Sequence, residues 1–234
     1  MANGFSKQIR ERIGAAVDGT IFVNSDFADI ADQETVRRTL NRLTQAGMLR
    51  RIRKGVYEKP KYSKLLHEYV AADPDAVAKA LARNYHWTIA PCGNTALNLL
   101  GLSTQVTAVW SYISDGPYKT YEWNSTKLEF KHRTNKEITG LSYMTSLVIQ
   151  ALKTLGRANV TPEIIQTLSE KLSEDEKQGR YAVSVLFLEY INKYISSHIY
   201  LSTLFDIFHD FCVKVYKASY PKSLVFSVSN SFKL

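Results

Sequence analysis

Apolar residues recur near the start of the chain with the spacing of an amphipathic helix. Val36, Leu40 and Leu43 fall at i, i+4 and i+7, which places them on one helical face. Asp32 offers a side-chain oxygen to cap the start of this helix, and Gly47 follows where a left-handed residue commonly ends one. The pattern therefore predicts a helix with one buried face and one polar, exposed face.

The segments around this helix complete a familiar order. Residues 5–16 carry another helical stripe of apolar residues, and residues 20–23 form a short β-type run followed by a short helix. After the main helix, residues 49–53 and 56–59 predict two strands joined by a tight turn at Gly55. The order helix, strand, helix, helix, hairpin predicts a winged helix-turn-helix.

Charge is spread unevenly along the chain. The formal net charge is +8, yet residues 37–64 alone hold ten basic residues against one acid, Glu58, a local excess of nine. A basic block on a folded element is typical of a polyanionic partner, most often nucleic acid. The alternative is a three-helix bundle with a solvated charged surface. That alternative predicts mixed charge on the exposed face, so the sequence favours nucleic acid.

Candidate contacts to operator DNA, the predicted double-stranded partner, follow from this arrangement. A helix fits the major groove, where Arg, Asn and Gln pair with purine edges, and a hairpin beside it meets phosphates. The candidates on the helix are Gln33, Thr35, Arg37, Arg38, Asn41 and Arg42. The candidates on the hairpin are Arg50, Arg51, Arg53 and Lys54.

The remainder of the chain mixes helical and β-type patterns. Strand patterns at residues 86–91 and 106–114 and a hairpin at residues 119–133 lie among four helical segments. The fold class is therefore α+β. We expect a winged helix-turn-helix domain at residues 1–62, a mixed α/β domain at residues 63–180 and a helical, aromatic-rich tail at residues 181–234 whose role is open. The aromatic residues Tyr112, Tyr118, Tyr121 and Trp123 are expected to pack a small sheet, with a ligand pocket as the alternative.

The sequence contains no recognisable catalytic motif. The five histidines are scattered, and no metal-ligand spacing, phosphate-binding glycine loop or nucleophile motif is present. We therefore expect no enzyme, metal or cofactor. Two distant cysteines, a charged start and the lack of a long apolar run predict a cytoplasmic protein without a membrane segment.

Three segments resemble one known family. They are "GMLRRIRKGVYEKP" at residues 47–60, "APCGNTALNLLGLSTQV" at residues 90–106 and "TPEIIQTLSEKLSEDEK" at residues 161–177. Together they resemble the AbiEi-type antitoxins of type IV toxin–antitoxin systems and their relatives described as a domain of unknown function. The resemblance covers residues 5–180 and implies repression of the protein's own operon through the winged helix. It also implies that the second domain counters a nucleotidyltransferase-like toxin without a tight complex. The alternative is a plain winged-helix regulator with a ligand-sensing or dimerising C-terminal domain.

Overall fold

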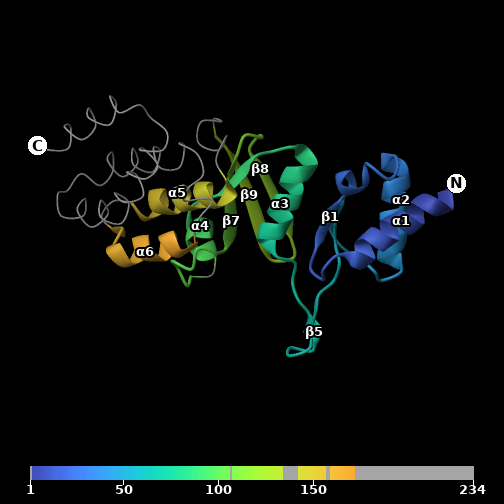
Figure 1. Ribbon diagram of the computed structural model, residues 1–234, viewed down its shortest axis with the longest axis horizontal. Coiled ribbons are helices and arrows are strands. Elements are labelled where there is room, and N and C mark those ends of the chain that lie inside the picture. The colour runs from blue at the N-terminus through green and yellow to red at the C-terminus, as the bar shows by residue number, and fades with distance from the viewer. Residues whose placement is uncertain (1, 106, 134–141, 157–158, 172–234) are drawn as a thin grey trace, which may run out of the picture. The chain divides into compact units, whose positions relative to one another are not determined.

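The protein is an α+β chain in which helices are interspersed among small sheets, as predicted (Figure 1). This computed structural model describes residues 2–105, 107–133, 142–156 and 159–171. By contacts the chain divides into two compact units, which comprise residues 1–91 with 106–139, and residues 92–105 with 140–234. The domain bounds drawn from the sequence stay a prediction. The predicted tail at residues 181–234 lies outside the described residues.

A first hydrophobic core forms where the sequence predicts alternating helices and strands. Its elements are α1 (Ala2–Ala15), β1 (Ile21–Val23), the 3-10 helix η1 (Asn24–Phe27), α2 (Gln33–Gln45), β2 (Arg50–Arg53) and β3 (Val56–Glu58). β3 lies between β1 and β2 and is antiparallel to both. Ile9 and Ile13 of α1 pack in one buried cluster with Val36, Leu40 and Leu43 of α2. The apolar stripes read from the sequence are therefore the faces that join the two helices to the sheet.

A second hairpin, which the sequence did not predict, follows β3. β4 (Tyr62–Ser63) pairs antiparallel with β5 (Glu68–Tyr69), and the two project from the body of the unit (Figure 1). The rings of Tyr62 and Tyr69 meet edge-on across the pair, with centroids 5.3 Å apart. Because β3 runs away from the Gly55 turn, this hairpin leaves from the end of the first sheet opposite that turn.

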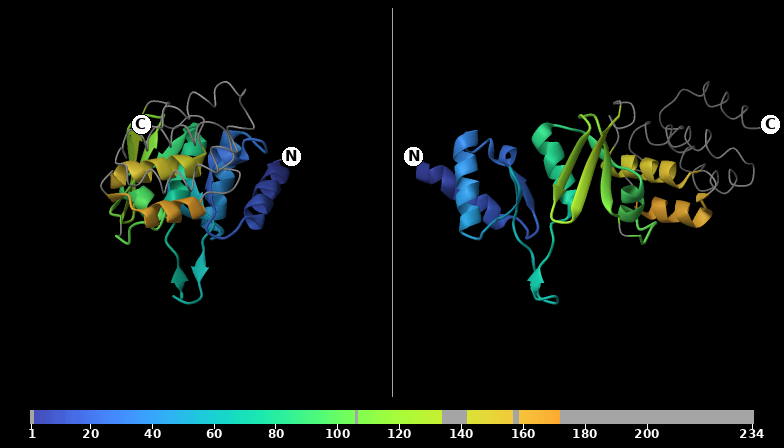
Figure 2. Two further views of the ribbon diagram at one scale, coloured as in Figure 1. Left: turned by 60° about the vertical axis from the view of Figure 1, so that its left-hand side comes forward. Right: turned by 180° about the vertical axis from the view of Figure 1, so that it is seen from behind.

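A helix lies between the first sheet and a second one (Figure 2). This helix, α3 (Pro74–Tyr85), is capped by Asp73 and ends at His86, whose φ of 56° is left-handed. The second sheet has the order β6-β7-β9-β8, with β7 and β9 parallel. Its strands are β6 (Ile89–Pro91), β7 (Val109–Ser114), β8 (Lys119–Trp123) and β9 (Thr126–His132).

The aromatic residues of this second sheet divide into two groups. Tyr112, Tyr121 and Trp123 are buried in the core that the sheet shares with α3, as the packing prediction required. Tyr118 is instead 67% exposed. The expectation that all four residues pack the sheet is therefore wrong for Tyr118, which precedes β8 and lies outside the alternation of that strand.

The second unit holds three described helices, α4 (Asn94–Leu99), α5 (Tyr143–Leu155) and α6 (Pro162–Lys171). Ala96 and Leu100 from the α4 segment pack with Leu147 and Leu152 of α5 and with Leu168 of α6. Helical segments were expected in this part of the chain, without the contacts that bring these three together. Within the described residues, every helix is too short or too polar to cross a bilayer.

Candidate nucleic-acid interface

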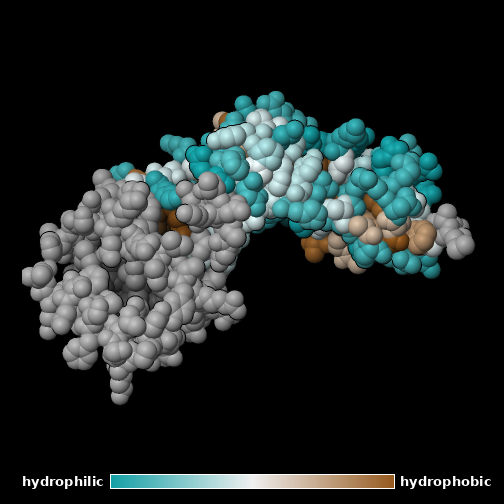
Figure 3. All heavy atoms as spheres, turned by 90° about the horizontal axis from the view of Figure 1, so that it is seen from above, coloured by the Kyte–Doolittle hydropathy of each residue, from teal (hydrophilic) through white to brown (hydrophobic). Residues whose placement is uncertain are grey.

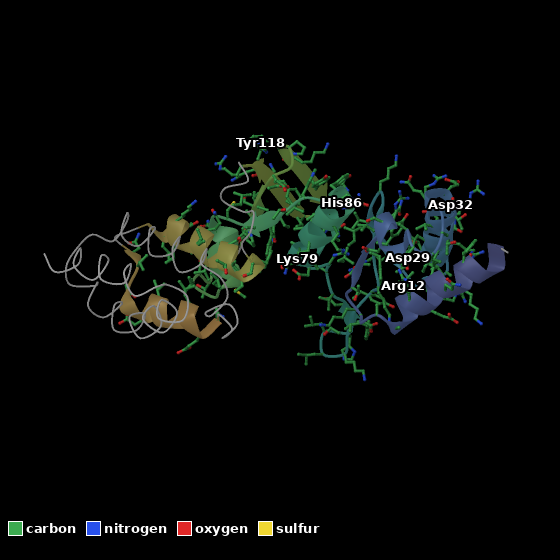
Figure 4. The ribbon with its side chains drawn as sticks, turned by 45° about the horizontal axis from the view of Figure 1, so that its top comes forward. Arg12, Asp29, Asp32, Lys79, His86 and Tyr118 are labelled. Atoms are coloured by element: carbon green, nitrogen blue, oxygen red, sulfur yellow. The ribbon has the colours of Figure 1, made fainter. Side chains whose placement is uncertain are left out.

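Helix α2 is fixed at its start by Asp32 (Figure 4). The Asp32 carboxylate accepts hydrogen bonds from the backbone N–H groups of Glu34 and Thr35, both at 3.0 Å, and from the Thr35 hydroxyl at 2.6 Å. The bonds from Thr35 hold the pKa of Asp32 below its ordinary value. The predicted cap is confirmed, and the Thr35 hydroxyl, a candidate DNA contact, is engaged in it.

The outward face of α2 includes an acid that the charge analysis left out. Glu34 accepts hydrogen bonds from Nε of Arg37 at 2.9 Å and from Nε of Arg38 at 2.7 Å. These two guanidinium groups hold the pKa of Glu34 below its ordinary value. The basic block counted from residue 37 began one turn after this carboxylate. The two arginines are exposed, as predicted, but both form ion pairs with Glu34.

Asn41 is not the outward-facing residue that the helical spacing indicated. Its side chain is half-buried, and its Oδ1 accepts a hydrogen bond from the hydroxyl of Tyr57 at 3.2 Å. Tyr57 is a core residue of β3, so the bond ties α2 to the sheet. Gln33 and Arg42 are exposed as expected. Among the described residues, Arg42 has no ion-pair partner.

The β2–β3 hairpin turns at Lys54 and Gly55, where Gly55 has a φ of 78° that suits glycine. Arg51 and Lys54 are exposed, and neither has an ion-pair partner in the part of the chain that the structure describes. The pairing register shifts between Arg51 and Arg53, a bulge that breaks the simple alternation. As a result Arg53 is half-buried, with its Cζ 4.1 Å from the ring centroid of Tyr121.

Arg50 is also drawn inward, against the prediction that it faces phosphates. Its Nε donates to Oε2 of Glu58 at 2.9 Å, and its Nη2 donates to the Val70 carbonyl at 2.7 Å. Glu58 is 1% exposed, and burial raises its pKa although the Arg50 guanidinium opposes the rise. Glu58, the one acid within the basic block, is therefore the buried ion-pair partner of Arg50, a cation of the same block.

The candidate residues thus fall into two groups. Those with exposed side chains are Gln33, Arg37, Arg38, Arg42, Arg51 and Lys54. Those engaged within the fold are Thr35, Asn41, Arg50 and Arg53. One face of the described residues is mostly hydrophilic or near neutral in hydropathy, with small apolar areas (Figure 3).

Comparison with known families gives a match that spans most of these elements. The model of a family of unknown function, DUF6088, matches residues 8–179, a span that runs from α1 through α6. No match was found among curated proteins. Since the family model covers well over half of the sequence, the chain belongs to the DUF6088 family, whose function is unknown.

Proposed function

We propose that residues 2–58 are a winged helix-turn-helix that binds double-stranded DNA through α2 and the β2–β3 hairpin. The order of elements and the sheet order β1-β3-β2 support this proposal. The observation that carries it is a helix with an exposed polar face that Asn41 and Tyr57 hold to a hairpin. On that hairpin Arg51 and Lys54 are exposed and have no carboxylate partner among the described residues. A helix in the major groove and a basic hairpin along the backbone are complementary ways to contact a duplex.

The exposure and the partners of each side chain suggest which part of the DNA it contacts. Gln33 and Arg37 are exposed on the first turns of α2, so we assign the base edges to them. Arg42, Arg51 and Lys54 are exposed cations without carboxylate partners among the described residues, so we assign phosphates to them. Asn41, Arg50 and Arg53 hold the reading elements in place instead of touching DNA.

Competition binding tests this assignment. The full chain is titrated with a duplex from the region upstream of its own gene and with a scrambled duplex, at several salt concentrations. Log affinity should fall linearly with log salt, by about 0.9 per phosphate contacted. Arg51→Ala and Lys54→Ala should weaken both duplexes alike and flatten the slope by about one unit per lost contact. Arg37→Ala should reduce the preference for the upstream duplex.

Arg10→Ala is the matched control, because Arg10 is an exposed cation on α1 outside the proposed contact surface. It should leave affinity and salt slope close to those of the wild type. Binding that is independent of salt, or an equal loss in Arg10→Ala and Arg51→Ala, would show that the hairpin makes no specific phosphate contacts.

A more specific role is proposed from the resemblance to AbiEi-type antitoxins. On this proposal the protein represses its own operon and counters a nucleotidyltransferase-like toxin encoded beside it, and residues from about 65 onward contribute to the neutralisation. The support is sequence likeness at residues 47–60, 90–106 and 161–177. The neighbouring gene product alone should inhibit growth of the host, and co-expression of this protein should restore that growth. Rescue by the winged helix alone, equal to that of the full chain, would remove the second domain from this role.

A plain transcriptional regulator is the competing proposal. Its C-terminal part would bind a small ligand or dimerise. The burial of Tyr112, Tyr121 and Trp123 in the core leaves those aromatic residues as packing residues, which weakens the aromatic pocket that the sequence allowed. A neighbouring metabolic operon, together with a small molecule that changes affinity for the upstream duplex, would favour this regulator over the antitoxin.

A further inference from the structure

Exposed aromatic side chains gather at one end of the second sheet, near the C-terminal end of α3. Tyr85 ends α3 and is 47% exposed, and Tyr118 precedes β8 and is 67% exposed. The ring of Tyr85 stacks on Trp87 with centroids 4.8 Å apart and 24° between the planes. Tyr118 meets the ring of His132 edge-on, with centroids 6.3 Å apart. Figure 4 labels Tyr118 and His86, the neighbour of Tyr85.

Gly116 joins the two pairs of rings. Its carbonyl oxygen lies 2.9 Å from Nδ1 of His132. A Cβ at Gly116 would lie 2.4 Å from Cε2 of Trp87, so the Trp87 ring rests directly on this backbone. Arg133 then donates from Nη1 to the Tyr118 hydroxyl at 3.3 Å. We name the four connected rings the aromatic strip, which consists of Tyr85, Trp87, Tyr118 and His132.

The strip is supported from beneath by the core. Trp87 packs edge-on against the buried ring of Phe130, with centroids 5.5 Å apart. The Tyr85 ring lies against Trp87, so the strip presents a ring that is already fixed. Aromatic rings that are held before binding lose little conformational freedom when a ligand stacks on them. This makes the strip a suitable platform for a flat ligand.

Exposed cations lie next to the strip, and a further cation packs on the core below it. Arg133 is exposed and contacts the Tyr118 hydroxyl, and Lys119, the residue that follows Tyr118, is also exposed. Asp115 is the acid of the same loop, and its carboxylate accepts a hydrogen bond from the Thr88 N–H at 2.9 Å. Tyr121 packs on Phe130 with centroids 5.8 Å apart and receives the Arg53 guanidinium on its ring. A flexible, negatively charged ligand that crossed the strip would therefore meet both stacking rings and positive charge.

We propose that the aromatic strip binds unpaired bases of a nucleic acid strand, with the bases stacked on Tyr85 and Tyr118 and the phosphates near Arg133 and Lys119. Every base has a π face, and cations interleaved with exposed rings are the usual features of surfaces that hold single strands. This proposal goes beyond duplex binding by α2 and does not depend on it. The chemistry fits single-stranded DNA and RNA equally, and the test separates the two.

Fluorescence anisotropy of the full chain tests the proposal with labelled oligo(dT), oligo(U) and duplex probes of about 12 units, within the usual site size. Tyr85→Ala and Tyr118→Ala should each weaken single-strand binding roughly 5- to 150-fold, the loss expected for one stacked base. Tyr118→Phe should bind like the wild type, because it keeps the ring. Duplex affinity should be unchanged in all three variants.

Tyr62→Ala is the matched control, since Tyr62 is an exposed tyrosine on the separate β4–β5 hairpin. It should leave single-strand affinity unchanged. Tighter binding of one labelled strand identifies DNA or RNA as the preferred source of the bases. Failure of the wild type to bind either strand, or equal losses for Tyr62→Ala and Tyr118→Ala, would overturn the proposal. Loss of duplex binding alone in Arg51→Ala would report on the winged helix and not on the strip.

Discussion

The hydroxyl of Tyr57 donates a hydrogen bond to Oδ1 of Asn41 across 3.2 Å, and this bond fastens the candidate reading helix to the sheet below it. Tyr57 is 1% exposed, so water cannot readily replace Asn41 as the partner of its hydroxyl. A polar group left without its partner in such a place costs more than an exposed one. We therefore expect Asn41 to contribute to the position of α2, and not to base contacts on the proposed function.

A double-mutant cycle on this pair should reveal coupling. Tyr57→Phe and Asn41→Ala should each lower the free energy of unfolding by about 1 kcal/mol, the net value of a hydrogen bond. The double variant should lose less than the sum of the two, because the second change removes a bond that is already broken. Urea denaturation measures all four proteins. Strictly additive losses would show that the bond contributes nothing to stability.

Replacement of Glu34 should strengthen DNA binding. In Glu34→Gln the side chain loses its charge, so Arg37 and Arg38 no longer have to be separated from a carboxylate before they meet DNA. We expect severalfold tighter binding to any duplex at low salt. Glu11→Gln is the control, because Glu11 is also paired with a cation one turn away but lies on α1. An unchanged affinity in Glu34→Gln would place the two arginines away from the DNA.

Arg50→Ala should destabilise the protein more than Arg51→Ala does. The change leaves the Glu58 carboxylate buried without its guanidinium, which should lower the free energy of unfolding by about 2–3 kcal/mol at neutral pH, somewhat under the range for a fully buried pair because water reaches Arg50. Arg51 is exposed, so Arg51→Ala should have little effect. Chemical denaturation of both variants gives the comparison.

The same variant should show a characteristic pH dependence. Burial raises the pKa of Glu58 above its ordinary value of 4.5, so this group favours folding below that pH and loses the contribution as pH rises. Without Arg50 the neutral acid becomes still more favourable. The stability difference between wild type and Arg50→Ala should therefore shrink as the pH falls from 7 toward 4.5. A difference that stays constant over this range would contradict the assignment.

Low pH should lower the stability of the protein through Asp29, in contrast to its effect through Glu58. Its carboxylate accepts hydrogen bonds from Arg12 at 2.8 and 2.6 Å, and these bonds hold its pKa below the ordinary 3.8 (Figure 4). A lowered folded-state pKa contributes stability that is present above the ordinary pKa and is lost as pH falls through the folded value. Asp29→Asn should lower the melting temperature at neutral pH and flatten its decline below pH 3.8. Parallel declines in both proteins would refute the pairing.

Gly116→Ala should destabilise the protein by about 1–3 kcal/mol, the usual cost of an overpacked site. The new Cβ would lie 2.4 Å from the Trp87 ring, and this ring cannot withdraw easily because it is stacked on Tyr85 and packed against Phe130. Gly14→Ala is the control, since nothing lies within 4 Å of a Cβ there. Equal melting temperatures for the two variants would show that Trp87 shifts freely.

Much of the N-terminal architecture follows from local pattern. The i, i+4, i+7 spacing of Val36, Leu40 and Leu43 identified the buried face of α2, and Asp32 and Gly47 marked its ends. These features depend only on residues close in sequence. At the neighbouring η1, the carboxylate of Asp26 accepts a hydrogen bond from the Val23 N–H, which is again a contact between residues close in sequence.

The candidate interface was less predictable, because its details depend on pairing between segments. Simple alternation along β2 would place Arg51 and Arg53 on one face, but the bulge between them turns Arg53 toward Tyr121, on a strand some seventy residues later. No local signal shows that Asn41 meets Tyr57. Likewise the parallel pairing of β7 with β9 brings His132 near Gly116, and no spacing in the sequence indicates this contact.

The contact between Gly116 and Trp87 has a consequence for the family as a whole. Because there is no room for a Cβ at position 116, the two positions cannot vary independently. A larger residue at 116 requires a smaller ring, or no ring, at 87. Among DUF6088 members, substitutions at these positions should therefore occur together. Members that keep the pair would retain the support beneath Tyr85, and members that changed both would have lost it. Covariation at this pair would thus mark which branches preserve the aromatic strip.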